Sequence, residues 1–225
     1  MVLHVTPRYR SLVLKENLKY INYVNSQNLT YELGITPFVY LTNEEFARMH
    51  MYRGFRFNSS SEQTQSYSVK QLNIDAIDWR KKGVVSPVQN QLTCGCCYAF
   101  AATELVAIAH RLQGLDAPVL SSQQVLDCSR EYGNSGCNGG TLGASLLYIK
   151  ENGVVAESAY PYVGKEESCQ VPASDLYTLK EWKQLQYTDE DTIKELVSSR
   201  PVSVGIASSW SNLQVDLFIQ RRYYI

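Results

Sequence analysis

Residues 91–100 read QLTCGCCYAF, in which three cysteines stand directly before a long apolar segment. The spacing of apolar residues over 97–113 predicts a largely buried helix, and a glycine follows as a stop signal. Cys97 then lies in the first helical turn, where free N–H groups and the helix dipole stabilise a thiolate. Gly95 permits a sharp turn before it, and Gln91 offers an amide donor for an oxyanion. Cys97 is a candidate nucleophile, with an inert buried cysteine as the alternative.

The bulk composition limits the classes of partner. The chain has 225 residues, 44% hydrophobic and 19% charged, enough for one large domain or two small ones. A formal net charge of -1 gives no basic field for nucleic acid. The sequence has no apolar run long enough to span a bilayer. The first ten residues lack the pattern of a secretory signal, so we expect that the natural N-terminus is missing.

All six cysteines lie between residues 94 and 169, which favours folding in an oxidising compartment. Their spacing alone leaves the pairing open. The C-x-C-C arrangement at Cys94, Cys96 and Cys97 differs from the C-x2-C pairs typical of structural zinc, so we expect no metal. A redox or metal protein using these three cysteines stays open as an alternative.

Local patterns predict the elements on either side of a linker. The first half shows an amphipathic helix over 9–25, a strand over 33–38 and a helix over 43–51 that Thr42 and Glu45 open as a capping box. The polar stretch 58–67 is typical of an exposed linker, so a domain boundary is expected there.

The second half of the chain is predicted to be mainly helical. Its further elements are a helix opened by a Ser121 and Gln124 capping box and running to Cys128, a helix over 141–151, a helix from Asp189 to Arg200 and a short buried strand over 201–206.

A family resemblance is carried by Gln91, Cys94, Gly95, Cys97, Ala99 and Phe100, which match the signature Q-x-x-C-G-x-C-W-A-F of papain-like cysteine proteases. Further matches stand in the same order on both sides: Ile77–Arg80, Val85–Val88, Leu126–Cys128, Cys137–Gly140, Tyr160–Tyr162 and Pro201–Val204. Within the family, the sequence resembles cathepsin O-like members, and we expect it to belong with them.

The resemblance implies an α+β fold of the papain-like cysteine protease type, with the helical left domain present and the β-barrel right domain largely missing. A mainly helical propeptide, truncated at its N-terminus, would occupy residues 1–57. A linker and maturation region at 58–72 and a partial peptidase domain at 73–225 would follow.

The resemblance also assigns roles to single residues. Cys97 would be the nucleophile, and Gln91 would form the oxyanion hole with the Cys97 N–H. Gly139 and Gly140 would bind the substrate backbone, although an ordinary glycine turn is the alternative. Leu142 would line the pocket for an apolar side chain. Disulfides Cys94 to Cys137 and Cys128 to Cys169 are implied, which leaves Cys96 unpaired, and neither a metal nor a cofactor is needed.

A second match lies in the N-terminal helix, where Arg10, Val13, Asn17, Ile21 and Asn25 follow the spacing of the family's helical pro-region. In the family this segment chaperones folding and covers the active-site cleft, so it would act as an intramolecular inhibitor. A generic amphipathic helix is the alternative. Two N-glycosylation sequons, at Asn28 and Asn58, fit passage through a secretory pathway.

Histidine is the main departure from the family pattern, because a cysteine protease needs an imidazole beside the sulfur. Of the three histidines, His4 and His50 belong to the expected propeptide. His110 lies on the same helix as Cys97, roughly 20 Å away. The family's histidine and Asn-Ser-Trp segments would follow residue 225, so we expect this chain to cleave peptides very slowly or not at all.

Together these features predict a cysteine endopeptidase, made as a monomeric zymogen, that acts on peptides or proteins in a lysosomal or extracellular compartment. We expect no nucleic-acid partner and no membrane span. A catalytically inactive homologue that acts as a binding or inhibitory protein is the alternative.

Overall fold

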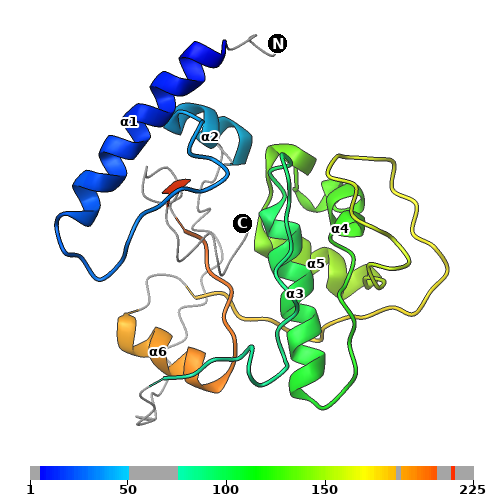
Figure 1. The fold of residues 1–225 in the computed structure, drawn as a ribbon. Coiled ribbons are helices and arrows are strands. Elements are labelled where there is room, and N and C mark those ends of the chain that lie inside the picture. The colour runs from blue at the N-terminus through cyan, green and yellow to red at the C-terminus, as the bar shows by residue number, and fades with distance from the viewer. Residues whose placement is uncertain (1–5, 51–75, 186–188, 207–213, 216–225) are drawn as a thin grey trace. The chain divides into compact units, whose positions relative to one another are not determined.

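The protein is described by a computed structural model over residues 6–50, 76–185, 189–206 and 214–215. Its helices are α1 (Pro7–Asn25), α2 (Asn43–His50), α3 (Cys97–Leu112), α4 (Ser122–Cys128), α5 (Leu142–Asn152) and α6 (Glu190–Ser199), with short 3₁₀ turns η1 (Arg130–Tyr132) and η2 (Gly136–Asn138) (Figure 1). The predicted linker at 58–72 lies outside the described residues. None of the described helices is both long enough and apolar enough to cross a membrane.

The chain divides into two compact units that interleave in sequence. The first contains residues 1–52, 88–95 and 205–225, and the second contains 53–87 and 96–204. This division assigns both the segment before the candidate nucleophile and the last residues of the chain to the same unit as α1.

Helix α1 begins where Thr6 caps it, the Thr6 hydroxyl accepting a hydrogen bond from the Tyr9 N–H. One face of the helix carries the buried residues Val13, Ile21 and Val24, which recur at the spacing of an amphipathic helix. The predicted helix over 9–25 is confirmed, with a start two residues earlier.

Polar residues on the same face of α1 form hydrogen bonds to the main chain of residues 33–41. The Asn17 amide donates to the Val39 and Leu41 carbonyls at 2.7 and 2.9 Å. Asn25 donates to the Leu33 carbonyl and accepts from the Leu33 N–H, at 2.9 and 2.8 Å. These bonds satisfy main-chain groups that a partner strand would otherwise have to satisfy.

Helix α2 opens with the capping box predicted from sequence. The Glu45 N–H donates to the Thr42 hydroxyl, and the Thr42 N–H donates to the Glu45 carboxylate. Arg10 of α1 also donates to the Glu45 carboxylate at 2.7 Å and to the Tyr40 carbonyl at 2.9 Å. One carboxylate thus ties the start of α2 to α1.

The strand predicted over 33–38 does not form: Leu33 makes a single bridge, residues 34–36 are irregular and a turn covers residues 37–40. Its partners are residues 214 and 215: the Gln214 amide donates to the Phe38 and Leu41 carbonyls, at 2.9 and 2.7 Å. Val215 packs in a core cluster whose buried members come from α1 and the turn segment: Ile21, Val24, Leu33 and Val39. Side-chain amides thus replace the β-ladder that the apolar run indicated.

The second unit is built on α3, which packs against both α4 and α5 (Figure 1). Its buried apolar side chains include Ala102 and Val106 from α3, Val125 and Leu126 from α4, and Leu146 and Ile149 from α5. The extended chain beside the helices contributes two isolated antiparallel bridges, Leu120 with Ala156 and Val154 with Tyr177. Helix–helix packing therefore forms this core.

The predicted ends of these helices agree with the structure, with one difference at α4. Thr141 caps α5 and Asp189 caps α6, each side chain accepting a main-chain N–H. Ser121 accepts the Gln124 N–H, but the Gln124 side chain donates to Tyr148 and to the Gly153 carbonyl instead of closing a capping box. Gln124 is fully buried, so its amide serves the core.

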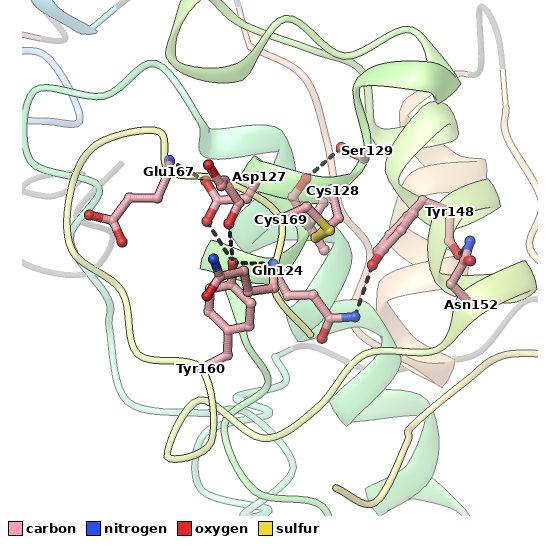
Figure 2. Close-up of a disulfide and its surroundings, with 12 residues drawn as sticks. Gln124, Asp127, Cys128, Ser129, Tyr148, Asn152, Tyr160, Glu167 and Cys169 are labelled. Carbon is pink, nitrogen blue, oxygen red and sulfur yellow. Dashed lines mark hydrogen bonds between the residues drawn. A yellow bond between two sulfur atoms is a disulfide. The ribbon is translucent and has the colours of Figure 1, made fainter. Parts of the chain in front are cut away.

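A disulfide joins Cys128, at the end of α4, to Cys169 on a long loop (Figure 2). The neighbouring Asp127 carboxylate accepts the Tyr160 hydroxyl at 3.0 Å and the Glu167 N–H at 2.8 Å. The disulfide and these hydrogen bonds fix the loop over 160–169 to α4.

Residues 201–206, predicted to form a strand, have no ladder partner among the described residues and stay irregular. Val204 and Ile206 are exposed. The preceding helix α6 belongs to the second unit, where the Trp79 indole N–H donates to the Val197 carbonyl at 2.7 Å.

Replacing Glu45 by Gln should flatten the dependence of stability on pH. The Arg10 hydrogen bond lowers the pKa of Glu45 below its usual 4.5, with the Thr42 N–H adding to the effect and partial burial opposing it. A carboxyl whose pKa is lowered in the folded state stabilises that state above its unfolded pKa and loses this contribution as pH falls. Thermal melting from about pH 6 to about pH 3 should therefore show a smaller decrease for Glu45→Gln than for the wild type.

The matched control is Glu44→Gln, because Glu44 is the adjacent acid on α2 and its side chain is exposed. This variant should follow the wild-type melting curve across the pH range. Equal slopes for Glu45→Gln and the wild type would contradict the assigned role of the Arg10 pair.

Removing the disulfide through Cys128→Ser with Cys169→Ser should lower the free energy of unfolding by about 4 kcal/mol, because the cross-link closes a loop with a sequence separation of 41. The control Tyr160→Phe removes only one hydrogen bond to Asp127 and should cost about 1 kcal/mol. Urea unfolding of each protein measures both. A double variant no less stable than Tyr160→Phe would show that hydrogen bonds alone hold the loop.

Candidate active site

Cys97 is the first residue of α3, and its side chain is exposed. The position matches the prediction of a thiol at a helix N-terminus. Desolvation by the surrounding protein nevertheless raises the pKa of the Cys97 thiol above its ordinary value, although the N–H groups of Tyr98 and Cys97 act to lower it. At neutral pH the sulfur is therefore mainly a thiol, and forming the nucleophilic thiolate requires a further cation or base.

Cys96 stands beside it in a different environment. Its thiol is fully buried and lies 3.1 Å from the Tyr162 hydroxyl, while the Tyr162 ring packs edge-on against Phe100. Burial raises the pKa of Cys96 to about 12. The two free cysteines are thus one accessible thiol and one protected thiol.

Tyr98 links the start of α3 to the glycine loop. Its hydroxyl donates to the Gly136 carbonyl at 3.0 Å. A Cβ atom added at Gly140 would lie 2.9 Å from the Tyr98 ring and 2.3 Å from Asn134 Oδ1, so the loop approaches closer than any side chain permits. The structure therefore brings Cys97 and the Gly139–Gly140 loop together within the second unit.

Asn134 organises this loop from inside the protein. Its buried amide donates to the Ser129 and Ser145 hydroxyls at 2.7 and 3.0 Å. Its carbonyl oxygen accepts the Thr141 N–H at 2.8 Å. Sequence reasoning missed Asn134, since its only signal was an asparagine between two glycines and near Cys137.

The two glycines differ in their main-chain bonding. Gly139 has φ 112° and donates to the Gly136 carbonyl while accepting from the Ser135 N–H at 2.7 Å. Within the described residues, no main-chain partner is found for Gly140. The conformation of Gly139 explains why glycine stands there, and the binding of a substrate backbone by this loop stays a prediction.

Leu142 is the first residue of α5 and is partly exposed, directly after the glycine loop. Its position is compatible with the predicted pocket wall. That role stays a prediction.

Gln91 is buried, and its carbonyl accepts the Cys94 N–H at 3.2 Å. It belongs to the first compact unit, whereas Cys97 belongs to the second, so its role as an oxyanion donor stays a prediction. Leu92 adopts φ 57°, the left-handed conformation that favours glycine. The structure thus gives a physical reason why a glycine suits this position better than leucine.

Four cysteines are disulfide-bonded: Cys94, Cys128, Cys137 and Cys169. The Cys128 to Cys169 pair is the one described above, and the pairing of Cys94 with Cys137 stays a prediction. No cluster of potential metal ligands occurs in the part of the chain that the structure describes.

Only one histidine has a described side chain. His110 lies near the far end of α3, with Nε2 2.9 Å from the Thr178 carbonyl oxygen and its ring edge-on to Tyr177. At 1.5 Å per residue the helix separates it from Cys97 by roughly 20 Å. His110 therefore has a packing role and cannot serve Cys97.

Comparison of the sequence with known proteins identifies a matching family. Residues 74–215 match the family described as papain family cysteine protease. Mouse cathepsin S is 38% identical over 213 residues, which cover 90% of this chain and 62% of the relative. Digestive cysteine proteinase 3 of the lobster Homarus americanus is 34% identical, covering 92% of this chain and 66% of the relative. The chain thus spans about two thirds or less of the length of these relatives.

Solved structures agree with these relatives and add the proform. The ragweed pollen cysteine protease Amb a 11 in its proform matches with a TM-score of 0.79 and 29% identity, covering 95% of this chain and 62% of that chain. Recombinant stem bromelain precursor matches with a TM-score of 0.74 and 32% identity, covering 93% and 68%. Both similarities extend over α1 and α2 as well as the second unit, because they cover nearly the whole chain. By sequence and by fold, the chain belongs to the papain family of cysteine proteases.

Proposed function

We propose that this protein is a cysteine endopeptidase made as a zymogen, with Cys97 as its nucleophile. The observation that carries the proposal is the accessible Cys97 thiol at the N-terminus of α3, next to Tyr98, whose hydroxyl bonds to Gly136 and whose ring lies against Gly140. Family membership supplies the reaction class.

The reaction follows from the position of the sulfur. A Cys97 thiolate attacks the carbonyl carbon of a peptide bond, and the Cys97 N–H and Gln91 amide are the expected donors to the oxyanion. The C–N bond breaks, an imidazolium protonates the leaving amine, and the acyl group remains as a Cys97 thioester. Water then hydrolyses the thioester and releases the acid. The imidazole must come from a residue other than His110.

Residues 1–57, which contain α1 and α2, are proposed as the propeptide that acts as intramolecular inhibitor and folding aid. Support comes from α1, whose Arg10, Asn17 and Asn25 each hold a turn of the following chain in place. The similar structures are also a proform and a precursor. The boundary of the propeptide near residue 57 is part of this proposal.

The disulfides support a lysosomal or extracellular site of action for a monomeric enzyme on peptide or protein substrates. Assignment to the cathepsin O-like members stays a prediction. A non-catalytic binding protein is the second candidate, favoured by one observation: His110, the one histidine whose side chain is described, lies at the far end of α3 from Cys97.

Replacing Cys97 by Ser should abolish peptide hydrolysis. The protein to be tested is the whole product of the natural gene. Loss of the nucleophile is expected to lower kcat by about a thousandfold or more, with substrate binding retained. The control is Cys96→Ser, which changes the neighbouring thiol that the proposed reaction does not use. Hydrolysis of fluorogenic peptides after removal of residues 1–57, the proposed propeptide, measures both variants.

Two results would overturn the proposed enzyme. One is hydrolysis that persists in Cys97→Ser. The other is a wild-type protein with a free Cys97 thiol that binds peptides without cleaving them, which would establish the non-catalytic alternative.

The two free thiols should differ sharply in alkylation. Iodoacetamide should modify Cys97 in the folded chain at a rate that rises with pH through a midpoint above that of an ordinary thiol, because its pKa is raised. Cys96 should react only after denaturation, since it is buried and its pKa is raised to about 12. Peptide mass mapping of a time course assigns the label. Equal rates at both sites in folded protein would contradict the described burial.

A further inference from the structure

The loop between α1 and the turn segment carries the sequon Asn28-Leu29-Thr30 at its tip. Every residue from 26 to 32 is exposed, so both the Asn28 amide and the Thr30 hydroxyl face solvent. Asn28 has φ 50°, a left-handed turn conformation that asparagine tolerates better than most residues.

Asn25, at the start of this loop, holds the two ends of the loop together. Its side chain donates to the Leu33 carbonyl and accepts the Leu33 N–H, which fixes both ends of the loop. A large group attached at Asn28 would therefore project away from the buried cluster of Ile21, Val24 and Leu33. The fold can carry such a group without moving its core.

Two further observations favour a carbohydrate at this site. Disulfide-bonded cysteines place folding in the oxidising compartment in which N-glycans are added. Large apolar side chains are also exposed around the loop, with Tyr23 64%, Leu29 47% and Ile35 68% accessible. A bulky, hydrophilic glycan at Asn28 would shield this apolar surface from water and from other chains.

We propose that Asn28 is an N-glycosylation site, so that the segment after α1 is glycosylated in the secretory pathway. In the transfer, the Asn28 side-chain amide nitrogen loses one proton and forms a C–N bond to the anomeric carbon of a lipid-pyrophosphate-linked oligosaccharide, whose bond to the pyrophosphate oxygen breaks so that the lipid pyrophosphate leaves. The Thr30 hydroxyl completes the acceptor sequence. This site is independent of the proposed peptidase activity, because no step of peptide hydrolysis uses Asn28. The second sequon, at Asn58, lies outside the described residues.

The test is expression of the full chain, behind a secretory signal, in eukaryotic cells. Peptide:N-glycosidase F in ¹⁸O-water converts each glycosylated asparagine to an isotope-labelled aspartate. Trypsin cleaves after Lys19 and Arg48, and after Arg56 and Lys70, so the two sequons fall on different peptides. Label at position 28 is expected in the wild type.

Two variants test the acceptor sequence, since each leaves Asn28 in place. Thr30→Ser keeps the hydroxyl and should keep the label, whereas Thr30→Ala should abolish it. Unlabelled Asn28 in wild-type molecules whose Cys128–Cys169 disulfide has formed would overturn the proposal, because that bond shows passage through the oxidising compartment. Label that persists in Thr30→Ala would overturn it as well.

Discussion

The packing of α3 against α4 and α5 is the constraint on which the second unit and its site depend. The N-terminus of the helix carries Cys97, and its far end is held by Arg111, which donates to the Val84, Ala117 and Pro118 carbonyls. With both ends held by the surrounding chain, the axis of α3 cannot move without breaking the core. The Tyr98 hydroxyl then sets the glycine loop relative to that axis.

Hydrogen bonds from side-chain amides to the main chain are the main feature that stabilises the first unit. A short apolar cluster gives it a core, but side-chain amides satisfy much of its irregular backbone. Asn17, Asn25 and Gln214 together hold main-chain carbonyls of Leu33, Phe38, Val39 and Leu41. Because these bonds need precise side-chain placement, a region without a sheet can still be well defined.

The two adjacent free cysteines differ in accessibility and reactivity because their local environments differ. Cys96 points into protein against Tyr162, where a charge would be costly, and Cys97 reaches solvent with main-chain N–H groups beside it. The helix N-terminus favours the Cys97 thiolate but does not outweigh desolvation. A peptidase built on this sulfur therefore depends on an imidazole to supply the remaining stabilisation.

Local sequence determined the helices almost to the residue, because caps, glycine stops and apolar spacing act within one or two turns. Thr42 with Glu45 forms the expected capping box, and Thr141 and Asp189 cap the helices whose starts were expected at these residues. The cysteine signature likewise identified the family, since it is a contiguous pattern.

Tertiary structure alone decided which apolar runs form strands, which distant residues bond to each other and how the Cys97 thiol titrates. The runs at 33–38 and 201–206 have strand-like composition, but a strand exists only where a ladder of main-chain bonds satisfies its backbone. The first run has one main-chain bond, from the Gly34 N–H to the Val215 carbonyl, and no ladder partner of 201–206 occurs among the described residues. Gln214 reaches carbonyls far away in sequence, and the pKa of Cys97 depends on how much protein surrounds its sulfur. Neighbouring residues do not determine the hydrogen bonds of Gln214 or the desolvation of the Cys97 sulfur, because both arise only when distant segments pack together.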